Sequence, residues 1–115
     1  MSPFLSFSHH ARERSVDRNV SEDEVRFIIQ YGLRERQAGF IVYQLLRKSF
    51  PAGLPGNSPY RRLELTKVVL CKCGHFVITV VRAKEVVQRD LKKYYGNQPQ
   101  RHCPCCAQDF QLLMQ

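Results

Sequence analysis

The stretch that decides the fold runs from Leu63 to Arg82 and reads L-E-L-T-K-V-V-L-C-K-C-G-H-F-V-I-T-V-V-R. Apolar and β-branched residues lie on both sides of Cys73-Gly74, which predicts two strands joined by a tight turn. In the first strand both alternating sets of residues are apolar, so both of its faces should be covered and helices should flank the sheet. The expected core residues of this hairpin are Val69, Leu70, Ile78 and Val80.

The composition indicates one small basic domain. A chain of 115 residues with 43% hydrophobic residues can bury a single core. It contains no apolar run of membrane-spanning length and opens without a secretory signal pattern, so the cytoplasm is the expected location. Lys and Arg number 18 against 10 acids, a net charge of +8. Such an excess favours a polyanionic partner, nucleic acid before an anionic membrane surface, unless the surface is merely basic.

Two helices are expected before the hairpin. Ser8 is a suitable N-cap for a helix over residues 9–18, and Asn19 can adopt the left-handed conformation that ends helices. Ser21 followed three residues later by Glu24 forms a capping box, so a second helix should begin there. An apolar stripe then continues until a glycine ends that helix.

The segments between the second helix and the hairpin differ in character. Residues 34–39 are polar and carry no strand pattern, whereas residues 40–46 have strand composition. Residues 52–60 are rich in Pro and Gly, which indicates a surface loop and the most mobile internal segment.

After the hairpin, residues 84–95 have helical spacing with a basic outer face, which predicts a third helix. We therefore expect an α+β domain over residues 1–96, with a small, mainly antiparallel sheet flanked by two N-terminal helices and one C-terminal helix. Residues 97–115 form a Cys-rich tail.

Residues 10–21 read H-A-R-E-R-S-V-D-R-N-V-S. This string resembles the opening H-A-x-x-R-x-x-x-R-G-[IV]-[ST] of a bacterial domain family of unknown function that is related in fold to the RelE and BrnT toxins. The resemblance covers about residues 8–96, with the strand Val77-Ile78-Thr79-Val80 and the basic exit after it in matching order. Asn19 replaces the usual Gly, Val81 stands where an aromatic residue is common, and the Cys-rich tail is an addition.

The resemblance implies a RelE/BrnT-like fold and an RNA-directed, ribonuclease-like activity without a catalytic cofactor. In such cleavage the ribose 2′-hydroxyl attacks the adjacent phosphorus, which requires proton transfer groups and cations near the phosphate oxygens. His10 is a candidate acid or base at a helix start, and Arg14 and Arg18 follow it on one helix face. The site residues that the resemblance implies are His10, Arg14, Arg18, Thr79, Arg82 and Tyr94.

Other interpretations of these residues stay open. His10 and Arg14 can instead fix the first helix through bonds to carbonyl groups and acids. One fold often hosts binding proteins and enzymes alike, so the alternative function is a non-catalytic basic module that binds nucleic acid or another partner. For an active toxin the expected partners are RNA and a small acidic antitoxin-like protein, with no membrane.

The cysteines suggest a structural zinc site. Cys103 and Cys106 form a turn of the zinc-knuckle type, and Cys71 and Cys73 resemble a second knuckle shortened by one residue. If Cys71 and Cys73 alternate along a strand, both point at a tail folded back on the hairpin. His75 and His102 are substitute ligands, a buried Cys71 thiol with a flexible tail is the alternative, and a disulfide fits a reducing compartment less well.

The zinc hypothesis makes a direct prediction. Purified protein should carry about one zinc per chain, and Cys103→Ser should lower that content, because a structural zinc requires its full set of ligands. Elemental analysis after chelator-free purification measures the metal. Sub-stoichiometric zinc together with five freely titratable thiols would contradict the hypothesis.

Overall fold

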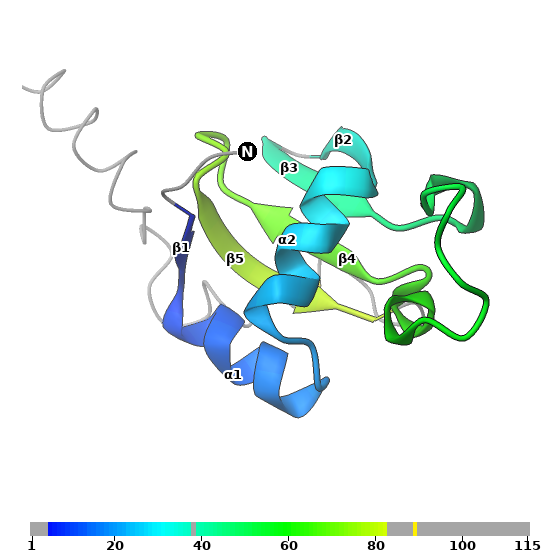
Figure 1. The fold of residues 1–115 in the computed structure, drawn as a ribbon. Helices are drawn as coiled ribbons and strands as arrows, with labels where there is room; N and C mark the ends of the chain where they lie inside the picture. Colours follow the sequence, from blue (N-terminus) through cyan, green and yellow to red (C-terminus); the bar gives the residue numbers. More distant parts are fainter. Residues whose placement is uncertain (1–4, 38, 83–88, 90–115) are drawn as a thin grey trace, which may run out of the picture.

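The computed structural model describes residues 5–37, 39–82 and 89 (Figure 1). Its described strands form one sheet in the order β1-β5-β4-β3-β2. β1 pairs with β5 in parallel and the remaining neighbours pair antiparallel, so the predicted α+β class with a mainly antiparallel sheet is confirmed. The strands are β1 (Ser6–Phe7), β2 (Leu33–Gln37), β3 (Phe40–Gln44), β4 (Lys67–Leu70) and β5 (Phe76–Val81).

Two helices precede β2, as predicted, and α2 lies across one face of the sheet (Figure 1). α1 (His9–Asp17) begins after Ser8, whose side chain accepts a hydrogen bond from the Ala11 N–H, and Asn19 has a φ of 53°. α2 (Glu22–Tyr31) begins with the complete capping box. The polar termini of both helices are therefore satisfied by local side chains that the sequence already displays. Neither helix is long and apolar enough to cross a membrane, and the same holds for every helix in the described ranges.

Gly32 ends α2 because this position has no room for a side chain. A Cβ atom there would lie 2.5 Å from the Ile28 carbonyl oxygen and 3.1 Å from the Gln44 carbonyl oxygen. Its φ is −73°, so the requirement is close approach rather than a left-handed backbone. The glycine thus lets the end of α2 pass directly over β3.

β2 was not predicted. Residues 34–39 were expected to form no element, but Leu33–Gln37 pair in continuous register with β3. The prediction was wrong because β2 is an edge strand with mostly exposed side chains, and such a strand shows no apolar alternation. Predicted strand 40–46 is confirmed over Phe40–Gln44.

The central hairpin is confirmed. β4 and β5 are antiparallel neighbours with a bulge between Val69 and Leu70. The connecting turn is closed by hydrogen bonds from the Gly74 N–H to the Cys71 carbonyl at 2.8 Å and from the Cys71 N–H to Phe76 at 2.9 Å, with Gly74 at a φ of 79°. Since β4 ends at Leu70, the premise that Cys71 and Cys73 alternate along a strand was wrong; they lie in the turn.

Both sheet faces bury apolar residues, as the pattern of the first hairpin strand predicted. The cluster on the helix side joins residues of both helices to the sheet, and a smaller cluster lies on the opposite face, with Phe40 packed against it. The four predicted core residues are all buried. The predicted third helix over 84–95 lies outside the described residues, apart from residue 89. The helix-side cluster includes Ala11, Val25, Ile28, Leu45, Leu63, Val68, Leu70, Val77 and Val80, and the opposite one Val42, Val69 and Val81.

Two short 3-10 helices, η1 (Arg47–Ser49) and η2 (Pro59–Leu63), follow β3. The Pro- and Gly-rich loop between them is held by Arg61, whose guanidinium donates to the carbonyl groups of Leu54 at 2.7 Å and Pro55 at 3.1 Å. Tyr60 stacks on Phe27 of α2 with ring centroids 4.2 Å apart and nearly parallel planes. These contacts attach the loop and η2 to α2.

Ile78 tests the core of the hairpin. Its side chain is 1% exposed, so Ile78→Ala should lower the free energy of unfolding by about 2–4 kcal/mol through lost apolar burial and a cavity. The control Val16→Ala, at a position 80% exposed, should change it by less than about 0.5 kcal/mol. Urea denaturation measures both, and equal midpoints would contradict the assignment of Ile78 to the core.

Candidate functional site

Three of the predicted site residues lie along one side of α1 and its C-cap, Arg18. His10, Arg14 and Arg18 recur one helical turn apart, and all three are partly buried, whereas Glu13 and Asp17 are exposed. At a rise of about 1.5 Å per residue the row is about 12 Å long. We call these three residues the α1 row.

Ser8 fixes the start of the α1 row beside β5. Its hydroxyl donates to the Ile78 carbonyl at 2.8 Å while accepting from the Ala11 N–H at 2.9 Å, and the residue is only 6% exposed. The Ser8 N–H also donates to the Val77 carbonyl at 2.9 Å. The N-terminal end of α1, and with it His10, is therefore attached to the middle of β5.

The two predicted site residues from β5 and its exit have different surroundings. Thr79 is fully buried and pairs with Val69, on the sheet face opposite the cluster that contains Ala11. Arg82 follows β5 directly, and its guanidinium donates a hydrogen bond to the Arg62 carbonyl oxygen at 3.4 Å. Tyr94, the remaining predicted member, lies outside the described residues.

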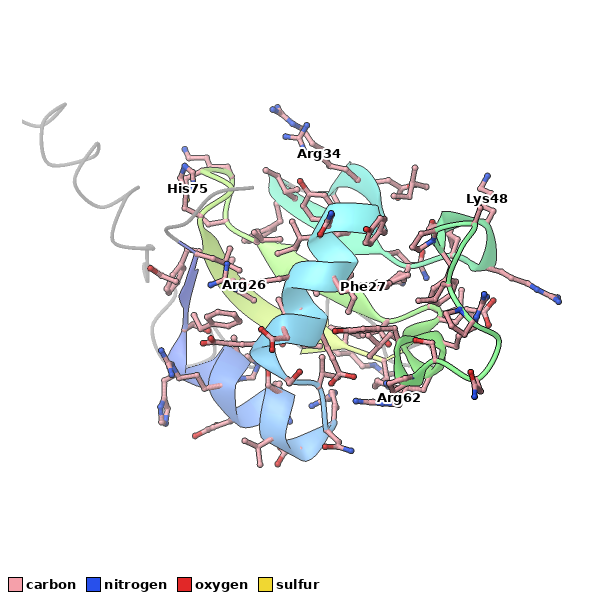
Figure 2. The ribbon with its side chains drawn as sticks, in the orientation of Figure 1. Arg26, Phe27, Arg34, Lys48, Arg62 and His75 are labelled. Carbon is pink, nitrogen blue, oxygen red and sulfur yellow. The ribbon has the colours of Figure 1, made fainter. Side chains whose placement is uncertain are left out.

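Arg62 links this exit to the other end of α1. Its guanidinium donates to the Asn19 carbonyl at 2.7 Å and to Glu24 Oε1 at 2.6 Å. Figure 2 shows Arg62 beside the connection between α1 and α2. Since Asn19 follows Arg18, a chain of contacts joins Arg82 through Arg62 to the C-terminal end of the α1 row.

Side chain to backbone contacts thus link arginines of three segments near the C-terminal end of α1: Arg62 of η2 contacts Asn19, which follows Arg18, and Arg82 after β5 contacts the Arg62 carbonyl. The role of Arg62 was not predicted. Its contacts span 38 to 43 residues of chain, so no local pattern could have indicated them.

Two acids on α1 interact with the basic side chains near this site. Arg14 Nη1 lies 3.7 Å from an Asp17 carboxylate oxygen, and the Asp17 side chain is 62% exposed. His9 Nε2 lies 2.9 Å from Glu13 Oε1, with the imidazole 81% exposed. The His9–Glu13 pair is exposed and therefore weak, whereas the Arg14 side chain is only 19% exposed. The His9–Glu13 pair was missed, although its i, i+4 spacing was visible in the sequence.

A groove of about 470 Å³ lies on a different side of α1. It is lined by Phe7, Arg12, Ser15 and Val16 together with residues 19–22, which connect α1 to α2, and the Arg12 guanidinium lies 6.0 Å from the centroid of the Phe7 ring. No member of the α1 row lines this groove. The groove is therefore separate from the predicted site.

Half of the predicted zinc ligands can be placed. Cys71 and Cys73 are both partly buried in the turn after β4, with His75 exposed next to them. Cys103 and Cys106 lie outside the described residues. Within residues 5–37 and 39–82, no group of three or more His, Cys, Asp or Glu side chains could hold a metal ion. A zinc site at this turn would thus depend on ligands from the tail.

No family model, no curated protein and no solved structure matches the chain. The resemblance to the RelE and BrnT toxins therefore depends on the motif and on the order of its segments.

The Arg62–Glu24 pair should stabilise the site. The two side chains are 38% and 13% exposed, so solvent screens the pair in part, and Arg62→Met should cost about 1–2 kcal/mol of unfolding free energy. A double-mutant cycle with Glu24→Gln should give a coupling of about 1 kcal/mol. The control Arg36→Met, at an exposed β2 position, should cost less than about 0.5 kcal/mol. A coupling indistinguishable from zero would show that the contact contributes no net stability.

Proposed function

We propose that this domain acts on RNA as a ribonuclease-like domain of the toxin superfamily, with a RelE/BrnT-like fold and cleavage through attack of the 2′-hydroxyl. The observation that supports this best is that Arg62 and Arg82, from two other segments, are linked by contacts to the C-terminal end of the α1 row, which itself carries Arg14 and Arg18 beyond His10. Guanidinium groups bind phosphate oxygens with paired hydrogen bonds, so such a set of arginines suits a polyanionic strand.

The α1 row suggests a division of roles. His10 would transfer a proton to or from the 2′-hydroxyl or the leaving oxygen, because an imidazole can do either near neutral pH. Arg14 would stabilise the charge that grows on the phosphate oxygens, exchanging its long contact with Asp17 for a phosphate. Arg18 and Arg82 would hold the neighbouring part of the strand. Thr79, buried on β5, would support the site from beneath.

A second function is favoured by a specific observation. Cleavage requires both a proton acceptor and a proton donor. The α1 row supplies one imidazole, that of His10, and its other two members are arginines. His9 is exposed and contacts Glu13, while His75 precedes β5 at the end opposite Arg82. This favours a non-catalytic, basic RNA-binding or interaction module, stapled by zinc through the Cys-rich tail.

The genome offers a further distinction. A small acidic DNA-binding protein encoded in the adjacent reading frame would favour the toxin and its antitoxin-like partner. An isolated gene would favour the binding module.

Substitution of His10 separates the two functions. With mixed cellular RNA as the substrate, His10→Ala should lower the cleavage rate by about 10²–10⁴-fold while most RNA affinity remains, because proton transfer contributes to rate rather than to ground-state binding. Arg14→Ala should lower both rate and affinity. Gel analysis of the products, which should end in a cyclic phosphate and form in the presence of chelator, measures cleavage. The exposed neighbour substitution His9→Ala serves as the matched control and should leave the rate unchanged.

Each outcome of this experiment has a defined consequence. The nuclease and the RNA-binding module both predict that RNA affinity falls steeply with salt, because each neutralised phosphate releases condensed counterions. Salt-dependent binding without a His10-dependent product would overturn the nuclease and leave the binding module. A lack of salt-dependent RNA binding would overturn the nuclease and the RNA-binding module and leave an interaction module with another partner.

A further inference from the structure

β2 is a regular strand at the edge of the sheet that the described residues form. It pairs with β3 through five consecutive residue pairs, and the sheet order places no described strand on its other side. Residues 33 to 36 are exposed, and the register shows neither a bulge nor an interruption. Figure 2 shows the side chain of Arg34 extending away from the body of the domain. An open edge of this kind can receive another strand.

The register identifies which backbone groups face outward. Gln37 and Phe40 flank a two-residue loop, and in such hairpins the flanking pair exchanges hydrogen bonds. Hydrogen-bonded and non-hydrogen-bonded pairs alternate along an antiparallel ladder, so Glu35 also bonds to β3. The N–H and C=O groups of Arg34 and Arg36 therefore point toward the open edge.

The arginine side chains lie at these same two positions. Arg34 is opposite Tyr43 and Arg36 is opposite Ile41, so both lie on the sheet face that carries α2. Glu35, opposite Val42, lies on the other face. The edge thus presents two cations about 7 Å apart on one face, aligned with the outward backbone groups.

The charges disfavour pairing of β2 with a second copy of itself. Two identical antiparallel edges are related by a twofold axis perpendicular to the sheet, and this axis keeps matching faces together. Every register of this kind that overlaps by three or more β2 residues then sets an arginine opposite an arginine. Like charges directly opposite are destabilising, so the edge rejects its own copy.

We propose that the β2 edge binds an extended acidic segment of another protein as an added antiparallel strand. Carboxylates at two alternate positions of that segment would lie opposite Arg34 and Arg36, while its backbone would pair with the outward groups of the same residues. A protein strand fits better than RNA, because the cations repeat at the strand period together with outward-facing peptide donors and acceptors. The proposal does not rest on the RNA-directed function.

The chain itself can supply the acidic strand for a test. A charge-swapped variant with Arg34→Glu, Glu35→Arg and Arg36→Glu has every β2 charge reversed. Mixed with the natural chain in the centred register, it sets each arginine opposite a glutamate. We expect association of the mixture at least about tenfold tighter than self-association of either chain, because opposite charges stabilise and like charges destabilise facing positions. Sedimentation velocity should then show a species of twice the 13.4 kDa chain mass in the mixture only.

Two controls make the result specific to the edge. In the first control, the swapped variant carries Arg36→Pro in place of Arg36→Glu. The proline removes an outward N–H and should abolish the mixed species. Circular dichroism checks that this variant is folded. The matched control Arg47→Glu, Lys48→Glu and Glu64→Arg makes the same net charge change at exposed positions away from β2 and should not associate.

Three results would overturn the proposal. The first is a mixture that stays monomeric although both chains are folded. The second is a mixed species that tolerates the proline, since it would form elsewhere. The third is loss of single-stranded RNA binding by the swapped variant without any mixed species, which would assign the edge to nucleic acid.

Discussion

The position of α1 on the sheet depends on the hydrogen bonds of Ser8. One buried hydroxyl accepts from the first turn of α1 and donates to the Ile78 carbonyl, while the Ser8 backbone continues the parallel contact of β1 with β5. A single residue therefore ends a strand, begins a helix and attaches that helix to the central hairpin. Because the helix start is fixed, every later position on α1 is fixed by the helical repeat, including the row that begins at His10.

Arg62 has the corresponding role at the other end of α1. Its contacts with Asn19 and Glu24 connect η2 to the turn between the two helices, and Glu24 is also part of the α2 capping box. Asn19 has a left-handed backbone, and its carbonyl accepts a hydrogen bond from the Arg62 guanidinium. Ser8 and Arg62 therefore fix the two ends of α1, and with them the positions from which Arg14 and Arg18 extend.

What could be predicted from the sequence was local. Ser8, Ser21 with Glu24, and the apolar residues around Gly74 each indicate an element within a few positions, and those elements are confirmed. β2 was missed because the pairing partner, rather than its own side chains, defines it. The Arg62 contacts were missed for the same reason, since they join residues whose proximity only the tertiary fold determines.

The positive charge of this domain is unevenly distributed along the chain. Between Glu35 and Glu64 the chain has no acid but five cations: Arg36, Arg47, Lys48, Arg61 and Arg62. Acids on the two helices serve the fold, as Glu24 does in the cap of α2 and Glu13 does beside His9. Of the five cations, Arg62 is paired with Glu24. Residues 36–63 therefore carry five positive charges and no negative one, and this part of the +8 net charge can act on a polyanion or on an acidic strand.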